Sequence, residues 1–350
     1  MPRVLRGLLL AVVLLLTLGA TPAAATHVQC GDVITENTTL DSDLSCSGDG
    51  LRVLANDVTL DLGGHEIAGA GSGAGVEIET VFPEPLDLSG IAVVDGTVRG
   101  FRDGIHMDGP TGTVLDGLVV KDNEIGVDCH YAPGCRVTNS VLQRNGRGIA
   151  FAAVDAGCRP RALVARNLIR HNGIGVWIAG CGTHVTRNRI EQNETKGVSI
   201  EDDVIADVSR NSIAGNGTDG VYVQYLAIVT ISGNQIAGNG LHGIHLDGGI
   251  GPYGPSATMH DNRVTRNSVD GIRVVNAYRT VIERNRTERN GDDGVDIDIT
   301  FDFISSLVGR NVASFNGDLG IEADAGTIDG GGNRARGNGN PAQCVGVSCK

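Results

Sequence analysis

The segment Gly220-Val221-Tyr222-Val223 carries a pattern that the sequence repeats along most of its length. A glycine, then valine or isoleucine, then any residue and usually another apolar residue, returns at intervals of 22 to 28 residues. A period of this length is typical of a repeat architecture, in which each unit buries its apolar side against its neighbours. The other glycines that open the pattern are Gly104, Gly126, Gly148, Gly175, Gly197, Gly243, Gly271, Gly294 and Gly320.

A second repeated feature precedes this glycine segment from about residue 160 onward. One asparagine is followed five residues later by another, and an apolar residue usually stands two places after the first. We expect the asparagines of successive units to stack, to hydrogen-bond along the stack, and to adopt the left-handed backbone that the turns require. The pairs are Asn167/Asn172, Asn188/Asn193, Asn211/Asn216, Asn234/Asn239, Asn262/Asn267, Asn285/Asn290, Asn311/Asn316 and Asn333/Asn338.

Each repeat therefore contains two short alternating segments and a turn-rich link, with no stretch long or periodic enough for a helix. Such a unit can bury its apolar side only by stacking in parallel on the next unit, at a spacing of about 4.8 Å. Parallel connections are right-handed in nearly all proteins. We predict an all-β fold, a right-handed single-stranded parallel β-helix of about twelve coils.

The two ends of the chain differ from the repeats. Residues 1–25 combine two early arginines, an apolar run too short to cross a bilayer and a small-residue cleavage site, which predicts a signal peptide. We expect one β-helix domain over residues 26–350, with an N-terminal cap at 26–75 and a C-terminal cap at 340–350.

The predicted leader and the charge restrict where the protein acts. A signal peptide indicates a secreted or periplasmic protein, and no later apolar stretch is long enough for a membrane span. The formal net charge is −13, and it becomes more negative without the leader's arginines. Such an acidic protein is a poor ligand for nucleic acid or an anionic membrane. We expect a monomer.

All eight cysteines follow the predicted leader, in a compartment where disulfides persist. Proximity in the sequence predicts one disulfide at each chain end, and a spacing of one repeat favours a bridge between neighbouring coils. A zinc site is the alternative, although no pair has the short spacing of typical zinc ligands. The predicted disulfides are Cys30 with Cys46, Cys158 with Cys181, and Cys344 with Cys349. Pairing of Cys129 with Cys135 is less favoured, because strand alternation points Cys129 inward.

Strand alternation also predicts which side chains of the glycine segments face solvent. The residues one and three places after each glycine form an apolar inward column that only Cys129 interrupts, while the outward column is rich in ionisable and aromatic groups. We select Tyr222, His245, Asp247 and Arg273 as catalytic candidates. The substrate-binding candidates are Trp177, Glu201, Asp296 and Asp298.

The selected side chains suit chemistry on sugar acids. Tyr222 or His245 can move a proton near neutral pH. Arg273 can hold a carboxylate through a forked hydrogen bond or stabilise a developing oxyanion, and Trp177 offers a flat ring on which a sugar can stack. The alternative interpretation is a solvated polar face of an exposed sheet.

The glycine and asparagine repeats resemble those of secreted right-handed β-helix proteins of the pectin-lyase-like superfamily, over roughly residues 50 to 340. This superfamily includes carbohydrate-binding and sugar-hydrolase modules, mannuronate epimerases and the NosD type. The resemblance implies a protein that acts on an extended polysaccharide, as a lyase or epimerase of a uronate-containing glycan. The alternative is a non-catalytic surface protein that binds carbohydrate.

Two motifs of that superfamily are present only in part. Epimerases of this fold resemble one another in an Asp-Pro-His-Asp stretch, of which Ile244-His245-Leu246-Asp247 keeps the histidine and one carboxylate. Polygalacturonases carry paired carboxyls that Asp270 with Asp292 or Asp293 would match, but the histidine of their third motif is missing here. Glycoside hydrolysis is therefore a further alternative.

None of these residues requires a cofactor. The carboxylates from Asp292 to Asp298 would suit one calcium ion, since calcium prefers clustered oxygen ligands. The sequence has no Gly-Gly-x-Gly-x-Asp repeat of the kind that binds calcium in rolls. We therefore expect at most one calcium site, at this cluster.

Overall fold

The structure is a computed structural model, and it describes residues 27–80, 87–152, 161–180, 182–249, 254–300 and 305–350. The predicted signal peptide, and the predicted disulfide between Cys158 and Cys181, lie outside the described residues.

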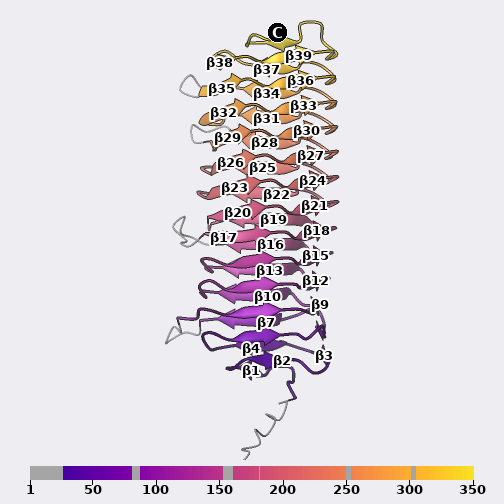
Figure 1. Cartoon of the computed structure of the whole chain (residues 1–350), viewed down its shortest axis with the longest axis vertical. Coiled ribbons are helices and arrows are strands. Elements are labelled where there is room, and N and C mark those ends of the chain that lie inside the picture. Colours follow the sequence, from indigo (N-terminus) through magenta and orange to yellow (C-terminus); the bar gives the residue numbers. More distant parts are fainter. Residues whose placement is uncertain (1–26, 81–86, 153–160, 181, 250–253, 301–304) are drawn as a thin grey trace, which may run out of the picture.

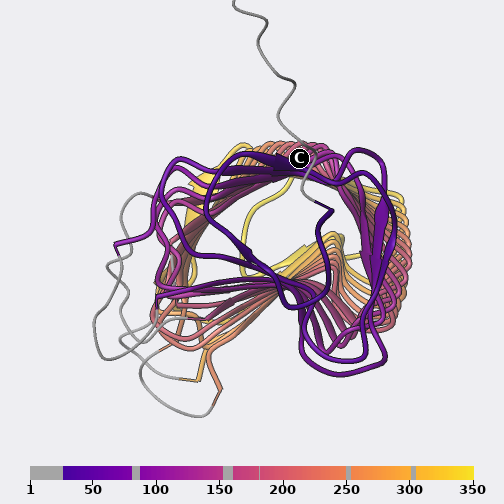
Figure 2. The same ribbon diagram turned by 90° about the horizontal axis from the view of Figure 1, so that it is seen from below.

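The described chain winds into a rod of stacked coils, and each full coil contributes one strand to each of three parallel sheets. Figure 2, which looks along the rod, shows the coils superposed around one interior. Every strand pairs in parallel with the strand of the next coil. The prediction of an all-β parallel β-helix is confirmed, with about 13 turns where the sequence indicated about twelve.

The first sheet contains the glycine segments. Its strands are β1 (Val33–Ile34), β4 (Leu51–Val53), β7 (Ala74–Glu79), β10 (Asp103–Asp108), β13 (Ile125–His130), β16 (Arg147–Ala152), β19 (Ile174–Ala179), β22 (Val198–Glu201), β25 (Val221–Gln224), β28 (Ile244–Asp247), β31 (Ile272–Val275), β34 (Val295–Asp298), β37 (Ile321–Ala323) and β40 (Cys344–Val345).

The second sheet follows the first around each coil. Its strands are β2 (Thr38–Thr39), β5 (Thr59–Asp61), β8 (Ala92–Val94), β11 (Val114–Asp116), β14 (Arg136–Thr138), β17 (Ala162–Ala165), β20 (Thr183–Thr186), β23 (Ile205–Ser209), β26 (Ile228–Ser232), β29 (Ser256–His260), β32 (Arg279–Glu283), β35 (Ser305–Gly309) and β38 (Ile328–Gly331).

The third sheet lies between the two asparagines of each repeat. Its strands are β3 (Leu44–Ser45), β6 (Glu66–Ala68), β9 (Thr97–Arg99), β12 (Val119–Lys121), β15 (Val141–Gln143), β18 (Leu168–Arg170), β21 (Arg189–Glu191), β24 (Ser212–Ala214), β27 (Gln235–Ala237), β30 (Arg263–Thr265), β33 (Arg286–Glu288), β36 (Val312–Ser314) and β39 (Arg334–Arg336). The expectation of two strands in each repeat was wrong, because the segment that forms the second sheet carries no glycine or asparagine to mark it.

The asparagines form two buried ladders along the rod, as the repeat predicts. In each ladder the backbone N–H and the side-chain Nδ2 of one asparagine donate to Oδ1 of the asparagine on the next coil. For Asn193 and Asn216 these distances are 3.1 and 2.9 Å. These bonds satisfy polar groups that the core would otherwise leave unpaired.

The left-handed backbone, in contrast, does not occur at the ladder asparagines. The residue directly before each asparagine has it instead, as Arg187 before Asn188 (φ 56°) and Gln192 before Asn193 (φ 54°) show. The expectation about the asparagines was therefore wrong. An asparagine in an ordinary backbone conformation can aim its amide along the stack, and the preceding residue makes the turn.

The repeated glycine of the first sheet is required by close packing between coils. A Cβ added to Gly220 would lie 2.6 Å from the carbonyl oxygen of Gly243 and 2.8 Å from Nδ2 of Asn239. No larger residue fits without moving the backbone of the next coil. The glycine thus allows the first sheet and the adjacent asparagine ladder to meet.

Disulfides occur at both ends of the described chain, where sequence proximity predicted them. Cys30 bonds to Cys46, and Cys344 bonds to Cys349. Cys129 and Cys135 are unbonded and buried, and burial raises the pKa of the Cys129 thiol well above its ordinary value. Within the ranges given above, no helix has the length and apolar character that crossing a membrane requires.

Candidate functional site

The outer face of the first sheet carries two neighbouring rows of side chains. We call the residues two places after each glycine the strand row; they are Ala150, Trp177, Ser199, Tyr222, His245, Arg273 and Asp296, and each pairs with the next in register. We call the residues directly before each glycine the pre-glycine row; they are Arg147, Ile174, Lys196, Asp219, His242, Asp270 and Asp293.

The strand row was predicted from alternation, whereas the pre-glycine row was missed. Simple alternation would turn a residue such as His242 toward the core, because Ile244 two places later is buried there. The glycine between them lies against the next coil, so the inward side is occupied by Gly243 and Ile244 in succession. His242 is thereby displaced to the outer face. The regular charge directly before the glycines was the available signal.

Lys196, Tyr222, His245 and Asp247 come together on three successive coils. The ammonium nitrogen of Lys196 lies 3.5 Å from the centre of the Tyr222 ring, and the Tyr222 and His245 rings meet edge to face at 5.2 Å. The Tyr222 hydroxyl lies 3.0 Å from an Asp247 carboxylate oxygen and 2.9 Å from Oε1 of Gln224. A cation, a phenol and an imidazole therefore border one small region.

Tyr222 is a proton donor in this environment. Partial burial raises the pKa of its phenol above the ordinary value, and the hydrogen bond to Asp247 and the negative charge there raise it further. Asp219 and Glu201 add smaller contributions in the same direction. The phenol is consequently protonated at neutral pH, and Asp247 fixes the direction of its hydroxyl.

Arg273 lies in the predicted place but has two carboxylate partners. Its guanidinium forms ion pairs with Asp296 and with Asp298 on the next coil. These contacts also occupy Asp296, which is only 9% exposed, and Asp298. Lys196 has a weaker partner, since its nitrogen lies 3.9 Å from Oε1 of Glu201. Lys196 is therefore better placed than Arg273 to meet an anion.

The remaining predicted residues lie on the amino-terminal side of this region. Glu201 accepts a 2.8 Å hydrogen bond from the hydroxyl of the buried Ser199. Trp177 carries the guanidinium of Arg147 above its ring, at 4.3 Å from the ring centre. Trp177 thus lies in the same row as Tyr222, with Ser199 between them.

Asp219, His242 and His245 offer one oxygen and two nitrogens within 4.8 Å of one another. The His242 and His245 rings are 4.8 Å apart, and Asp219 Oδ1 lies 3.7 Å from Nδ1 of His245. Nδ1 of His242 lies 3.1 Å from the buried Asp270 carboxylate. The backbone N–H of Asp270 also donates to Nδ1 of His242, at 3.3 Å, so Asp270 holds this side of the ring and leaves Nε2 as the nitrogen for a metal.

Carboxylates crowd the carboxy-terminal coils of the same face. Asp270, Asp293 and Asp296 form one cluster, and Asp292, Asp293 and Asp318 form another. Burial raises the pKa of Asp293 to about 7, and the charges of Asp270 and Asp292 act in the same direction. Burial likewise raises the pKa of Asp292. Calcium binding at these carboxylates stays a prediction.

Comparison with solved structures identifies similar folds at low sequence identity. The A-module of the Azotobacter vinelandii mannuronan C-5 epimerase AlgE6 has a TM-score of 0.50 and 15% identity, covering 92% of this chain and 91% of that one. The Dettilon tailspike protein gp208 has a TM-score of 0.49 and 14% sequence identity. The matched region covers 90% of this chain but only 61% of the tailspike. The periplasmic alginate epimerase AlgG has a TM-score of 0.36 and 14% sequence identity, covering 90% of this chain and 73% of that one. At 15% identity, the similarity to the AlgE6 module supports the fold alone.

Sequence comparisons give a more definite result. No curated protein matches the chain. A profile described as the right handed beta helix region matches residues 196–349. A second profile, described as periplasmic copper-binding protein (NosD), matches residues 66–252, which is more than half of the chain. The chain therefore belongs to the NosD family of right-handed parallel β-helix proteins.

Proposed function

We propose that this protein is exported and binds an extended uronate-containing polysaccharide along the first sheet, where it acts as a lyase or epimerase. The observation that carries the proposal is the meeting of Lys196, Tyr222 and His245 on three successive coils. The epimerase names among the fold neighbours and the periplasmic description of the family are consistent with it.

Both reactions begin by removing the proton on the carbon next to a sugar carboxylate. Lys196 pairs with the carboxylate, which stabilises the negative charge that develops on its oxygens. The imidazole of His245 accepts the proton. Tyr222 then supplies a proton, either to the opposite face of the same carbon in epimerisation or to the departing glycosidic oxygen in elimination.

The assignment of Tyr222 as the acid follows from its raised pKa and its hydroxyl's bond to Asp247. A phenol that holds its proton is a poor base in the resting protein, so the base is the neighbouring imidazole. Asp247 is a positioning residue in this scheme. Arg273 stabilises the adjacent acidic coil and does not contact substrate.

The proposal is tested on a panel of uronate-containing polysaccharides. Elimination is followed by the ultraviolet absorbance of the unsaturated product, and epimerisation by incorporation of solvent deuterium. We expect turnover of at least one member by the wild type and a loss of about 10²–10⁴-fold in Tyr222→Phe and His245→Gln.

Tyr225→Phe and His184→Gln are matched controls, because these side chains lie on the surface outside the site. Tyr225 is 58% exposed, so its substitution should leave turnover unchanged. Binding of a glycan by the wild type without turnover would replace the catalytic proposal by that of a carbohydrate-binding protein. If the wild type neither binds nor turns over any member of the panel, both the catalytic and the carbohydrate-binding proposals are removed.

A second function is favoured by Asp219, His242 and His245, because the family profile is described as copper-binding. Two imidazoles and a carboxylate suit a divalent copper ion, and Asp270 already orients one imidazole. The residues therefore fit the metal. Bound copper would supply a Lewis acid or a one-electron redox centre at this face.

Copper binding is tested by titrating the purified protein with Cu²⁺ and recording its electron paramagnetic resonance spectrum. We expect one site with nitrogen ligands in the wild type, and a loss of that signal in His242→Gln. His184→Gln removes a histidine of the second sheet and should leave the signal unchanged. An identical spectrum in the wild type and His242→Gln would exclude this site.

A further inference from the structure

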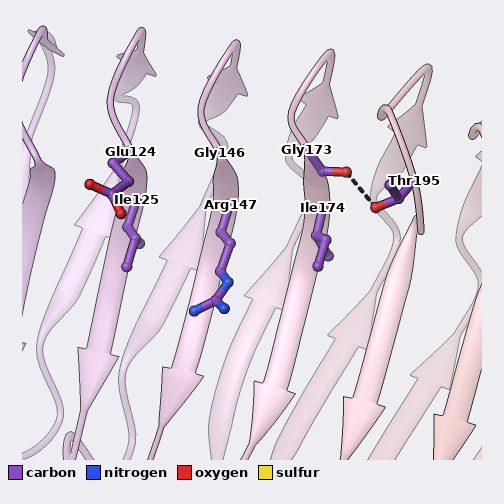
Figure 3. A pocket seen from close by; sticks show the side chains of 7 residues that line it. All are labelled: Glu124, Ile125, Gly146, Arg147, Gly173, Ile174 and Thr195. Carbon is purple, nitrogen blue, oxygen red and sulfur yellow. Dashed lines mark hydrogen bonds between the residues drawn. The ribbon is translucent and has the colours of Figure 1, made fainter.

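A groove lies on the amino-terminal side of the proposed reaction centre. It has a volume of about 420 Å³ and crosses strands β13, β16 and β19. Figure 3 shows the residues that line it: Glu124, Ile125, Gly146, Arg147, Gly173, Ile174 and Thr195. Thr195 directly precedes Lys196, and its hydroxyl donates a 2.7 Å hydrogen bond to the Gly173 carbonyl. The groove therefore reaches the residue directly before Lys196.

Arg147 is the cation among the residues that line this groove. Among the residues that the structure describes, no carboxylate lies within ion-pair distance of it, and Figure 3 shows the Glu124 carboxylate on the neighbouring coil without a contact to it. Arg144, three residues earlier, pairs instead with Asp122 at 2.7 Å. Arg147 stacks above Trp177, which fixes its plane and leaves its N–H groups directed away from the ring.

The floor beside Arg147 is apolar. Ile125 and Ile174 flank it in the same row, one on each neighbouring coil. Arg147 and Lys196 are two coils apart, which places their backbones roughly 10 Å from each other. Two cations separated by an apolar strip match a polymer whose sugar rings expose C–H groups between regularly spaced carboxylates.

We propose that Arg147 and Trp177 form a subsite for a second acidic sugar of the same polymer. Arg147 binds the carboxylate of that sugar, and the Trp177 ring and the two isoleucines contact its C–H face. The inference rests on the proposed function, and it adds the direction in which the polymer runs along the first sheet. The polymer extends from Tyr222 toward β16, because the opposite direction leads to the carboxylates of Asp270 and Asp293.

The test compares binding of uronate oligosaccharides from the monosaccharide to the hexasaccharide by calorimetry, using the intact protein. Affinity of the wild type should rise with length until the chain reaches Arg147. Arg147→Gln should weaken binding of the long oligomers on the order of tenfold, as expected for loss of a charge-assisted hydrogen bond, and leave the short ones unchanged. Arg187→Gln removes an equal charge from an exposed turn on another face and should have no effect.

The outcomes separate this inference from the proposed function. Equal weakening of short and long oligomers in Arg147→Gln, or none, would overturn the subsite, while turnover by the same preparations would still support the reaction centre. A wild type that turns over glycans with an affinity independent of length would likewise remove the subsite alone. Absence of all binding would overturn both. Neutral oligosaccharides should bind the wild type and Arg147→Gln equally, because they carry no carboxylate.

Discussion

The outer face of the first sheet has one geometry and two electrostatic characters. Around strands β16 to β22 it presents the cations Arg147 and Lys196, neither with a carboxylate closer than 3.9 Å among the described residues. Around β31 to β37 it presents a surplus of carboxylates, and Arg273 is shared by Asp296 and Asp298. The scaffold repeats, so the difference arises from which side chains occupy the two rows and which of these find partners. The part of the face around β16 to β22 is thus suited to anions, and the part around β31 to β37, here called the acidic half, to protons or cations.

The largest expected difference between the two regions is the loss of kcat when Lys196 or Arg273 is replaced. Lys196→Gln should lower kcat by about 10²–10³-fold, because the charge that develops on the sugar carboxylate loses its cation. Arg273→Gln should lower it by less than about tenfold, since that guanidinium is held by two aspartates. Steady-state kinetics on whichever glycan the wild type turns over measures both. A larger loss of kcat in Arg273→Gln than in Lys196→Gln would mean that Arg273, in the acidic half, is the catalytic cation.

The same two variants should behave in the opposite way in unfolding experiments. Arg273→Gln leaves Asp296, which is 9% exposed, without its cation, and should lower the free energy of unfolding by about 1–3 kcal/mol. Lys196→Gln loses mainly a contact with the Tyr222 ring, worth about 0.5–1 kcal/mol.

Arg284→Gln is the control for this stability comparison. It removes an exposed pair with Asp261, which solvent screens, and should lower the free energy of unfolding by less than Arg273→Gln does. Urea unfolding at neutral pH gives all three values. Equal losses in Arg273→Gln and Arg284→Gln would mean that the stability of the acidic half does not depend on Arg273.

Asp293 predicts a pH dependence confined to the acidic half. Its pKa is about 7 in the folded chain against 3.8 for an unperturbed aspartate. Between these values the folded state holds more protons than the unfolded one, so stability should fall as pH rises from about 4 to about 7 and then level off. Asp293→Asn should remove this loss and raise Tm at pH 8 by a few degrees.

Calcium provides the complementary measurement at the same carboxylates. An ion bound there at pH 8 would replace the lost protons, so adding Ca²⁺ should raise the wild-type Tm and have less effect on Asp293→Asn. A stability profile that is flat between pH 4 and 8 in the wild type, with or without Ca²⁺, would contradict this description of the acidic half.

Much of the fold was predictable because two kinds of residue mark it. The glycine before each first-sheet strand is required by contact with the next coil, as at Gly220, and the ladder asparagines are required by buried hydrogen bonds. The second sheet has no such requirement and was missed. The left-handed position before each asparagine was also missed, because arginine, glutamine and glycine all occur there.

The candidate site was predictable in part for the same reason. Alternation placed Tyr222 and His245 in one row, and the structure pairs them in register. Alternation does not continue through the glycine, so Lys196 and His242 were not recognised as members of the same surface. The partners of Arg273 depend on which side-chain conformations reach across a coil, and a repeat pattern carries no information about that.

The smallest expected effect concerns salt. Raising the ionic strength from about 0.1 M to about 1 M shortens the screening length from about 10 Å to about 3 Å. Binding of an acidic oligosaccharide should therefore weaken by roughly threefold to tenfold in the wild type, and less in Arg147→Gln, where one of two cations is gone. Calorimetry at the two ionic strengths measures this, with a neutral oligosaccharide as control. Stronger binding of the acidic oligomer at high salt would mean that it contacts the carboxylates around Asp270 and Asp293, so that the polymer lies on the other half of the face.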